Sequence, residues 1–274
     1  MVDGLLMIAG GAAAGLFGSL LGLGGGILIV PLLTLAFGLD LREAVGVSLV
    51  AVIVTSGASA GVYLQRHVAN LRLGMTLELF TAIGALVGGL VAFLLSDRVL
   101  AGLFAVLLVY AAAAMVRRGT PVEAAPPDDL DEPDASAPAM PLGLTLGGPG
   151  YPVRRLGLGA VGSVGAGVVS ALLGIGGGLV KVPVMHLVMG VPLRVATATS
   201  NLMIGVTASA SAVIYLLRGE IDPFVAGPTA IGVFLGASLG SRTAHRLDLR
   251  VLRILFVVVL LYTAVQMVRR AVGG

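Results

Sequence analysis

A lysine closely follows an oligoglycine run in the stretch GIGGGLVKVP, which occupies residues 174–183 of an otherwise apolar region. Glycines at this density interrupt a helix, and the interruption leaves backbone N–H groups unpaired at the positive end of the next helical segment. Such a helix end binds anions, and a lysine ammonium on its first turn would add to the positive charge. The sequence therefore predicts that Gly176, Gly177, Gly178 and Lys181 contact an anionic substrate.

A second copy of this motif, GLGGGILIVP at residues 22–31, has Ile29 at the position of the lysine. We expect its glycines Gly24, Gly25 and Gly26 to form the corresponding backbone site. Unwound backbone at membrane depth persists only where protein or a water-filled cavity surrounds it, so two breaks predict a lined cavity near the midplane. The alternative is that these glycines only let neighbouring helices approach closely.

Lys181 has two further interpretations besides an anion site. A lysine deep in a membrane costs at least a few kcal/mol, so its ammonium normally faces a cavity or a partner. Its long stem could instead carry the charge to the membrane interface. It could also pair with Glu78, a carboxylate whose counterpart in the other copy is Ala230.

Polar side chains with helical spacing follow both glycine motifs. Ser48 and Thr55 are seven residues apart, as are Ser200 and Thr207, so each pair shares one face of a helix. Asn201 directly follows Ser200. A single hydroxyl in a helix often bonds only to its own backbone. A stripe matched in both copies, next to the glycine breaks, nevertheless predicts a polar lining for the substrate pathway.

Two titratable side chains in apolar segments, Glu78 and His186, are candidates for coupling transport to protons. The chain has no cysteine, and its three histidines are scattered without metal-ligand spacing. No nucleophile–base arrangement indicates catalysis. We therefore predict no metal, no cofactor and no enzymatic activity.

The elements that must position these residues form two copies of one unit. At an offset of 152 residues the glycine motifs align, together with Pro31 and Pro183, and the match continues without a gap. Such self-similarity indicates duplication. It predicts transmembrane repeats at residues 1–118 and 153–274. Between them, residues 119–152 are rich in Pro, Asp and Gly and are predicted to form a solvated linker.

Composition places both units in a membrane. The chain is 57% hydrophobic and 11% charged, against about 25% charged residues in soluble domains. Apolar runs such as 99–116 and 254–268 approach the roughly 20 residues that a spanning helix needs. The net charge of +3 comes mostly from arginines at the ends of apolar runs, which indicates membrane topology and no nucleic-acid partner. An all-α, polytopic integral membrane protein surrounded by lipid bilayer is predicted.

The first apolar segment, about 5–37, is too long for one crossing and leaves two arrangements open. A spanning helix followed by a re-entrant half-helix gives four crossings per copy and parallel repeats. Two short crossing helices give five, and inverted repeats. With five, eleven loop arginines lie on the linker side and five opposite, whereas four crossings divide them nine to seven. The positive-inside rule favours inverted repeats with a cytoplasmic linker and both termini outside.

The doubled glycine–proline motifs, each followed by REAVGVSL (42–49) or RVATATSN (194–201), resemble the TauE/SafE sulfite exporter family of membrane transporters. The resemblance covers nearly the whole chain except the linker. It implies a multi-pass protein of the bacterial inner membrane that carries small sulfur-containing or organic anions, such as sulfite, sulfoacetate or related sulfonates. It also implies a secondary transporter, often an exporter.

The residues alone lead to the same class, a small-anion transporter, but they do not distinguish sulfite from a sulfonate or a carboxylate. The alternative is an anion channel, or a permease for a non-sulfur organic anion such as a small carboxylate. Small-residue faces on the third apolar segments could seal the two repeats together or join two chains as a homodimer, and the sequence is compatible with both.

Overall fold

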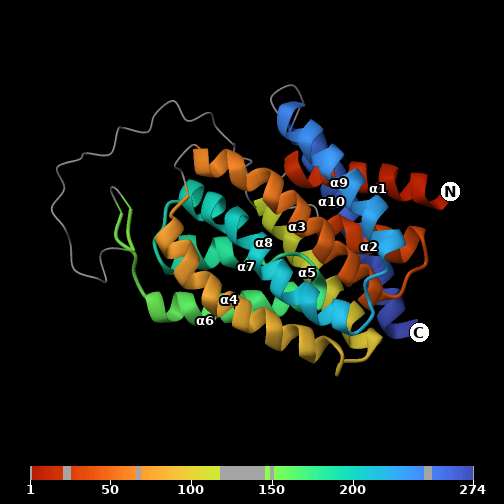
Figure 1. Cartoon of the computed structure of the whole chain (residues 1–274), viewed down its shortest axis with the longest axis horizontal. Coiled ribbons are helices and arrows are strands. Elements are labelled where there is room, and N and C mark those ends of the chain that lie inside the picture. The colour runs from red at the N-terminus through yellow and green to blue at the C-terminus, as the bar shows by residue number, and fades with distance from the viewer. Residues whose placement is uncertain are drawn as a thin grey trace.

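The computed structural model describes residues 2–20, 26–65, 69–117, 146–148, 151–243 and 249–273. These residues form a bundle of helices, apart from one isolated β-bridge between Gly148 and Tyr151 (Figure 1). The helices are α1 (Val2–Leu20), α2 (Gly26–Ala36), α3 (Leu41–Gln65), α4 (Leu71–Ala92), α5 (Asp97–Arg117), α6 (Leu156–Leu173), α7 (Gly178–Pro183), the π-helix η1 (Val184–Val188), α8 (Leu193–Leu217), α9 (Pro223–Thr243) and α10 (Leu249–Gly273).

Six of the described helices are long and apolar enough to cross a membrane, and they are α4, α5, α6, α8, α9 and α10. Their outward faces carry many exposed large apolar side chains, such as Leu79 on α4, Val106 on α5 and Ile254 on α10. In water such faces would be unfavourable, whereas in lipid they are solvated. The prediction of an all-α polytopic membrane protein is confirmed.

The internal repeat is also seen in the residue numbers at which the helices begin. Helices α2, α3, α4 and α5 each start 152 residues before α7, α8, α9 and α10, respectively. Each half therefore contains five helical units in the same order, with the glycine motif between the first and the second. Most of the segment at 119–152, including all of 119–145, lies outside the described residues. Its assignment as a solvated linker stays a prediction.

Equivalent helices of the two halves run antiparallel. Gly46, near the start of α3, packs against Glu220 just beyond the end of α8, whereas Ser56 further along α3 bonds to Asn201 near the start of α8. In the same way Gly102 at the start of α5 faces Ala271 at the end of α10. This arrangement is the one that inverted repeats require, and it supports that prediction over parallel repeats.

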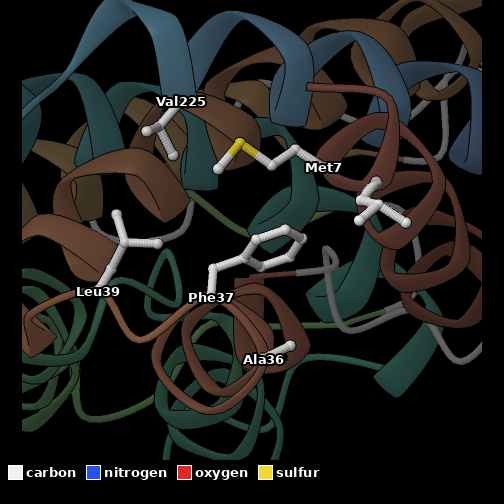
Figure 2. Close-up of a pocket in the computed structure, with 6 residues that line it drawn as sticks. Met7, Ala36, Phe37, Leu39 and Val225 are labelled. Carbon is white, nitrogen blue, oxygen red and sulfur yellow. The ribbon is translucent and has the colours of Figure 1, made fainter. Parts of the chain in front are cut away.

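In both halves the two helices that flank the glycine motif lead back to the same side of the bundle. The N–H of Arg154, just before α6, donates to Met189 O, just after η1, at 3.0 Å. In the first half, Met7 of α1 and Phe37 after α2 line one apolar pocket of about 420 Å³ (Figure 2). The pocket has no charged lining residue. Each hairpin therefore begins and ends on one side of the bundle, and the three long helices that follow carry the chain to the other side.

The two halves interlock through exchanged contacts. Helix α1 packs along α9, and α4 packs along α6, so the first helix of each half contacts the fourth of the other. Glycines allow this approach, because Gly236 lies directly against the backbone of Ala12 and Gly84 against that of Val164. These small-residue faces are thus covered within one chain. Formation of a homodimer stays a prediction, and these glycine faces are not available as its interface.

Substitution of Gly167 by alanine is expected to destabilise the protein by about 1–3 kcal/mol, because the new methyl group would meet the backbone of Thr81 and Ala85 on α4. Gly165, two residues away on the same helix, faces open space, so Gly165→Ala serves as the matched control. Thermal unfolding of the two purified variants measures the difference. Equal stability of the two variants would contradict close packing of α6 on α4.

Candidate functional site

The second glycine motif forms a break between two helices, as the sequence predicts. Helix α6 ends at Leu173, and Gly174, Gly176 and Gly177 have φ angles of +68°, +73° and +78°. Side chains disfavour this left-handed backbone region, which explains the glycines. Helical structure resumes at Gly178 and continues through α7 into η1. The chain therefore unwinds for four residues and reverses direction within the bundle.

The two glycine motifs meet near the middle of the bundle. The Ser48 hydroxyl donates to Gly174 O at 2.7 Å and also lies 3.2 Å from Gly26 O, so it ties both motifs together. Gly176 packs against Val52 and Ile204, which lie near the centres of α3 and α8. Gly24 and Gly25 lie outside the described residues, while Gly26 begins α2. The start of α2 thus lies against the break that follows α6, and the two helix pairs enter the bundle from opposite ends.

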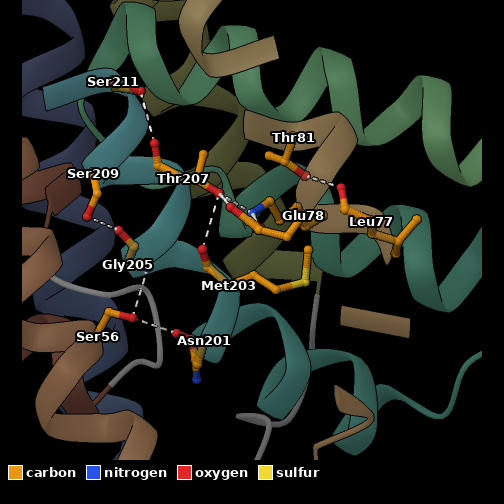
Figure 3. Close-up of polar contacts among 11 residues, drawn as sticks. Ser56, Leu77, Glu78, Thr81, Asn201, Met203, Gly205, Thr207, Ser209 and Ser211 are labelled. Carbon is orange, nitrogen blue, oxygen red and sulfur yellow. Dashed lines mark hydrogen bonds and ion pairs between the residues drawn. The ribbon is translucent and has the colours of Figure 1, made fainter. Parts of the chain in front are cut away.

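A buried ion pair lies beside the second break. Lys181 Nζ is 3.0 Å from Glu78 Oε2 and donates to the Thr207 hydroxyl at 2.5 Å. Thr207 in turn donates to Glu78 Oε1 at 2.6 Å (Figure 3). Only 2% of Lys181 and 7% of Glu78 is exposed. The three residues come from α7, α4 and α8, so the network joins both halves of the chain.

This geometry shows the pairing that the sequence left open as an alternative for Lys181. Its charge is balanced by Glu78 and does not reach the bundle surface. Lys181 is the only lysine in the sequence, and the other sixteen cations of the Lys and Arg count are arginines. An ammonium has three N–H donors. Two of them are used here, and the third has no partner among the residues that the structure describes.

Two buried hydroxyls without partners lie next to the same break. Ser170 Oγ and Ser200 Oγ are fully buried and make no hydrogen bond within the described part of the chain. A methyl group on Gly177 would lie 3.3 Å from Ser170 Cβ, and one on Gly178 would lie 3.5 Å from Ser200 Oγ. An unsatisfied buried hydroxyl costs about 1–3 kcal/mol, so such groups point to a missing acceptor or donor.

Ser170 is a residue that the sequence reasoning missed. The signal was available, because its counterpart at the 152-residue offset is Gly18, just as the counterpart of Lys181 is Ile29. Both differences place an extra hydrogen-bond donor beside the second break. The second half is therefore the more polar of the two at this site.

The remaining predicted polar residues have structural bonds. Thr55 donates to Ala51 O at 3.1 Å and is 3.0 Å from Val52 O, which is back-bonding within α3. The backbone carbonyl of Asn201 accepts from the Ser56 hydroxyl at 2.8 Å, and the N–H of Gly205 donates to the same hydroxyl at 2.9 Å. Ser56 is thereby inserted into the hydrogen-bond ladder of α8, next to Ser200.

His186, the second coupling candidate, bonds elsewhere. Its Nδ1 lies 2.9 Å from Val191 O, and this contact requires a proton on Nδ1. The structure thus brings Glu78, and not His186, into hydrogen-bond contact with Lys181. A role of either residue in proton coupling stays a prediction.

An apolar layer separates the ion pair from the linker side of the bundle. Its core includes Leu73, Leu77, Met185 and Met203, which pack together between α4, η1 and α8. Beyond this layer the Asn70 amide donates to the carbonyl of Leu146 and the hydroxyl of Tyr151, and its backbone N–H donates to Thr199. Burial raises the pKa of the Tyr151 hydroxyl, which keeps it protonated. Lys181 is thus covered on this side of the bundle, and only 2% of the residue is exposed.

Comparison with known proteins gives one family. The model of the sulfite exporter TauE/SafE family matches residues 7–267. The chain is 24% identical to the probable membrane transporter protein YunE of Bacillus subtilis, over 96% of this chain and 97% of that protein. It is 26% identical to the probable membrane transporter protein MJ0441 of Methanocaldococcus jannaschii, over 91% and 90%.

A third similar protein is the longer probable membrane transporter protein MamO of Magnetospirillum gryphiswaldense. It is 26% identical over 96% of this chain and 44% of MamO. No solved structure gives a significant match. All three relatives are named as membrane transporters, and none is named as an enzyme.

Proposed function

Because the chain belongs to the TauE/SafE sulfite exporter family and is a multi-pass transporter of the cell membrane, we propose that it carries small anions through a site at the two glycine breaks. The proposed substrates are sulfite, sulfoacetate and related sulfonates, and the proposed direction is export. The name of the family supports the sulfur-containing class. The residues at the second break support an anion of small size.

The observation that carries this proposal is the set of donors around the start of α7. The ammonium of Lys181 and the hydroxyls of Ser170 and Ser200 lie beside Gly177 and Gly178, in the buried centre of the bundle. Each can donate to an oxygen of a bound oxyanion. Hydrogen bonds to a charged group contribute about 1.5–3 kcal/mol each, and a buried site strengthens them. An oxyanion would also satisfy both unpartnered hydroxyls.

The packed layer on the linker side matches the closed gate that a carrier with alternating access has on one side of its site. Leu73, Leu77 and Met203 pack on that side of Lys181, which is itself only 2% exposed, so we expect a substrate to reach the site through a conformational change. Inverted repeats commonly supply this change by rocking one bundle against the other around a central site. A channel would instead conduct without saturation. A carboxylate permease stays the alternative for the substrate class.

Substitution of Ser200 by alanine is expected to lower subsaturating flux of sulfite or sulfoacetate into proteoliposomes by about tenfold or more. The reason is the loss of one hydrogen bond to the charged substrate, since about 1.4 kcal/mol corresponds to a factor of ten. Ser209→Ala is the matched control, because Ser209 lies on the same helix, is exposed and bonds to Gly205 O.

Saturating, protein-dependent flux in the wild type would support a carrier. Equal flux through the two serine variants would contradict the placement of the site. Absence of flux for sulfite, sulfoacetate and acetate in the wild type would overturn anion transport itself, and acetate flux alone would favour the carboxylate alternative.

A further inference from the structure

The Lys181–Glu78 ion pair indicates which ion is transported together with the anion. We infer that one anion and one proton bind together: the anion accepts the third N–H of Lys181 and becomes the counter-charge of its ammonium, while Glu78 stays in place as a neutral acid. This inference rests on the proposed function and adds the coupling ion and the charge of the substrate.

The geometry makes the anion and the carboxylate competitors for one cation. Glu78 Oε2 already lies 3.0 Å from Nζ of Lys181, and Thr207 holds the other carboxylate oxygen at 2.6 Å. An anion that accepts the third N–H of Lys181 would therefore lie close to a negative carboxylate. Two like charges within a few ångströms repel strongly in a buried site, and one of them is then neutralised by a proton.

No other cation on the neighbouring helices can balance a second negative charge. Helix α6 contains no charged residue, and Lys181 is the only charged residue of α7. Glu78 lies six residues beyond Arg72 on α4, about 9 Å along the helix axis, and Arg72 is exposed at the surface whereas Glu78 is buried. The remaining charged or titratable groups on α8 and η1 are Arg194 and Tyr215 near the two ends of α8, and His186, which bonds to Val191 O.

The charges balance in both states. Before binding, the ammonium and the carboxylate sum to zero. After binding, a proton from solvent sits on a Glu78 oxygen and the anion faces the ammonium, so the sum is again zero. A monoanion keeps the buried site neutral, whereas a dianion would leave an uncompensated negative charge. Of the proposed substrates, the inference therefore selects singly charged oxyanions, such as hydrogensulfite or a monosulfonate, and it disfavours sulfoacetate, which carries two negative charges near neutral pH.

Methanesulfonate is a suitable probe, because its single charge does not change between pH 5 and pH 9. We expect the detergent-purified wild type to take up about one proton for each methanesulfonate bound near neutral pH, measured with an indicator dye in weakly buffered solution. Its affinity should rise up to tenfold for each unit by which the pH falls. Glu78→Gln, which imitates the neutral acid, should bind without proton uptake and with an affinity independent of pH.

Two further variants make the comparison specific. Glu220→Gln, in the loop after α8, should keep the proton uptake of the wild type, and Lys181→Met should bind no methanesulfonate. Because Lys181 is the only lysine, protein labelled with ¹³C-lysine gives a single side-chain signal, which should shift on binding.

The outcomes separate this inference from the proposed function. Binding of methanesulfonate by the wild type without proton uptake, and with the same affinity at all pH values, would overturn the linkage and leave anion transport intact. Failure of methanesulfonate, sulfite and sulfoacetate to bind would overturn both. If Glu78→Gln does not fold, the wild-type proton uptake decides, with Glu220→Gln as its control.

Discussion

Substitution of Glu78 by methionine is expected to lower the free energy of unfolding by about 3–5 kcal/mol, because it leaves the Lys181 ammonium buried without a counter-charge. The ammonium cannot relax towards water, since only 2% of the residue is exposed. Thr207 would remain as its single hydrogen-bond partner among the described residues. A hydroxyl oxygen does not balance a full charge, so the loss is larger than that of an ordinary hydrogen bond.

The double substitution Glu78→Met with Lys181→Met is the decisive control. Replacement of a complete buried ion pair by apolar side chains of similar size is often neutral or stabilising. We therefore expect the double variant to recover most of the stability lost in Glu78→Met, and to transport no anion. Thermal unfolding in detergent or nanodiscs measures all members of the cycle. A double variant as unstable as Glu78→Met would show that the residues do not act as a pair.

Substitution of Gly177 by alanine is expected to reduce anion flux at least tenfold while the protein still folds. At φ +78° an alanine costs about 1–2 kcal/mol of backbone energy. Its methyl group would also lie 3.0 Å from Ala166 O and 3.5 Å from Lys181 Cε. The backbone of the break lies next to the donors of the proposed site, so the methyl group would displace these donors. Small displacements of groups that bind substrate are costly for function.

Gly219→Ala separates this effect from strain alone. Gly219 has a φ of +75° and no atom near an added methyl group, so the variant has the same backbone penalty at the end of α8, away from the breaks. Proteoliposome flux and thermal unfolding are to be measured on both variants. Similar losses of flux in the two would indicate that the break contributes stability only.

Much of the fold follows from patterns within the sequence. The 152-residue offset reappears in the helix starts, and the interruption after Leu173 lies where the glycines of the second motif predict it. Such features depend on local backbone preferences and on the length of apolar runs. The arginine distribution also favoured inverted repeats, and the antiparallel course of α3 against α8 supports that choice.

The ion pair could be named only as one alternative. Glu78 and Lys181 are separated by 103 residues, and their contact depends on α4 of one half packing near α7 of the other. Periodicity and composition do not specify which helices exchange partners between repeats. The role of Ser48 was beyond reach for the same reason, since its hydroxyl joins two glycine motifs that are distant in the sequence.

The exchange of partners between the halves constrains how the protein is made. Helix α1 (Val2–Leu20) leaves the ribosome long before α9 (Pro223–Thr243), yet Gly11 and Gly15 of α1 pack directly against the backbone of α9. We therefore expect the side of α1 that packs on α9 to stay uncovered by protein until the second half has been inserted into the bilayer. The same holds for α4, whose partner α6 belongs to the second half. Insertion of the second half is then the step that covers α1 with α9 and α4 with α6.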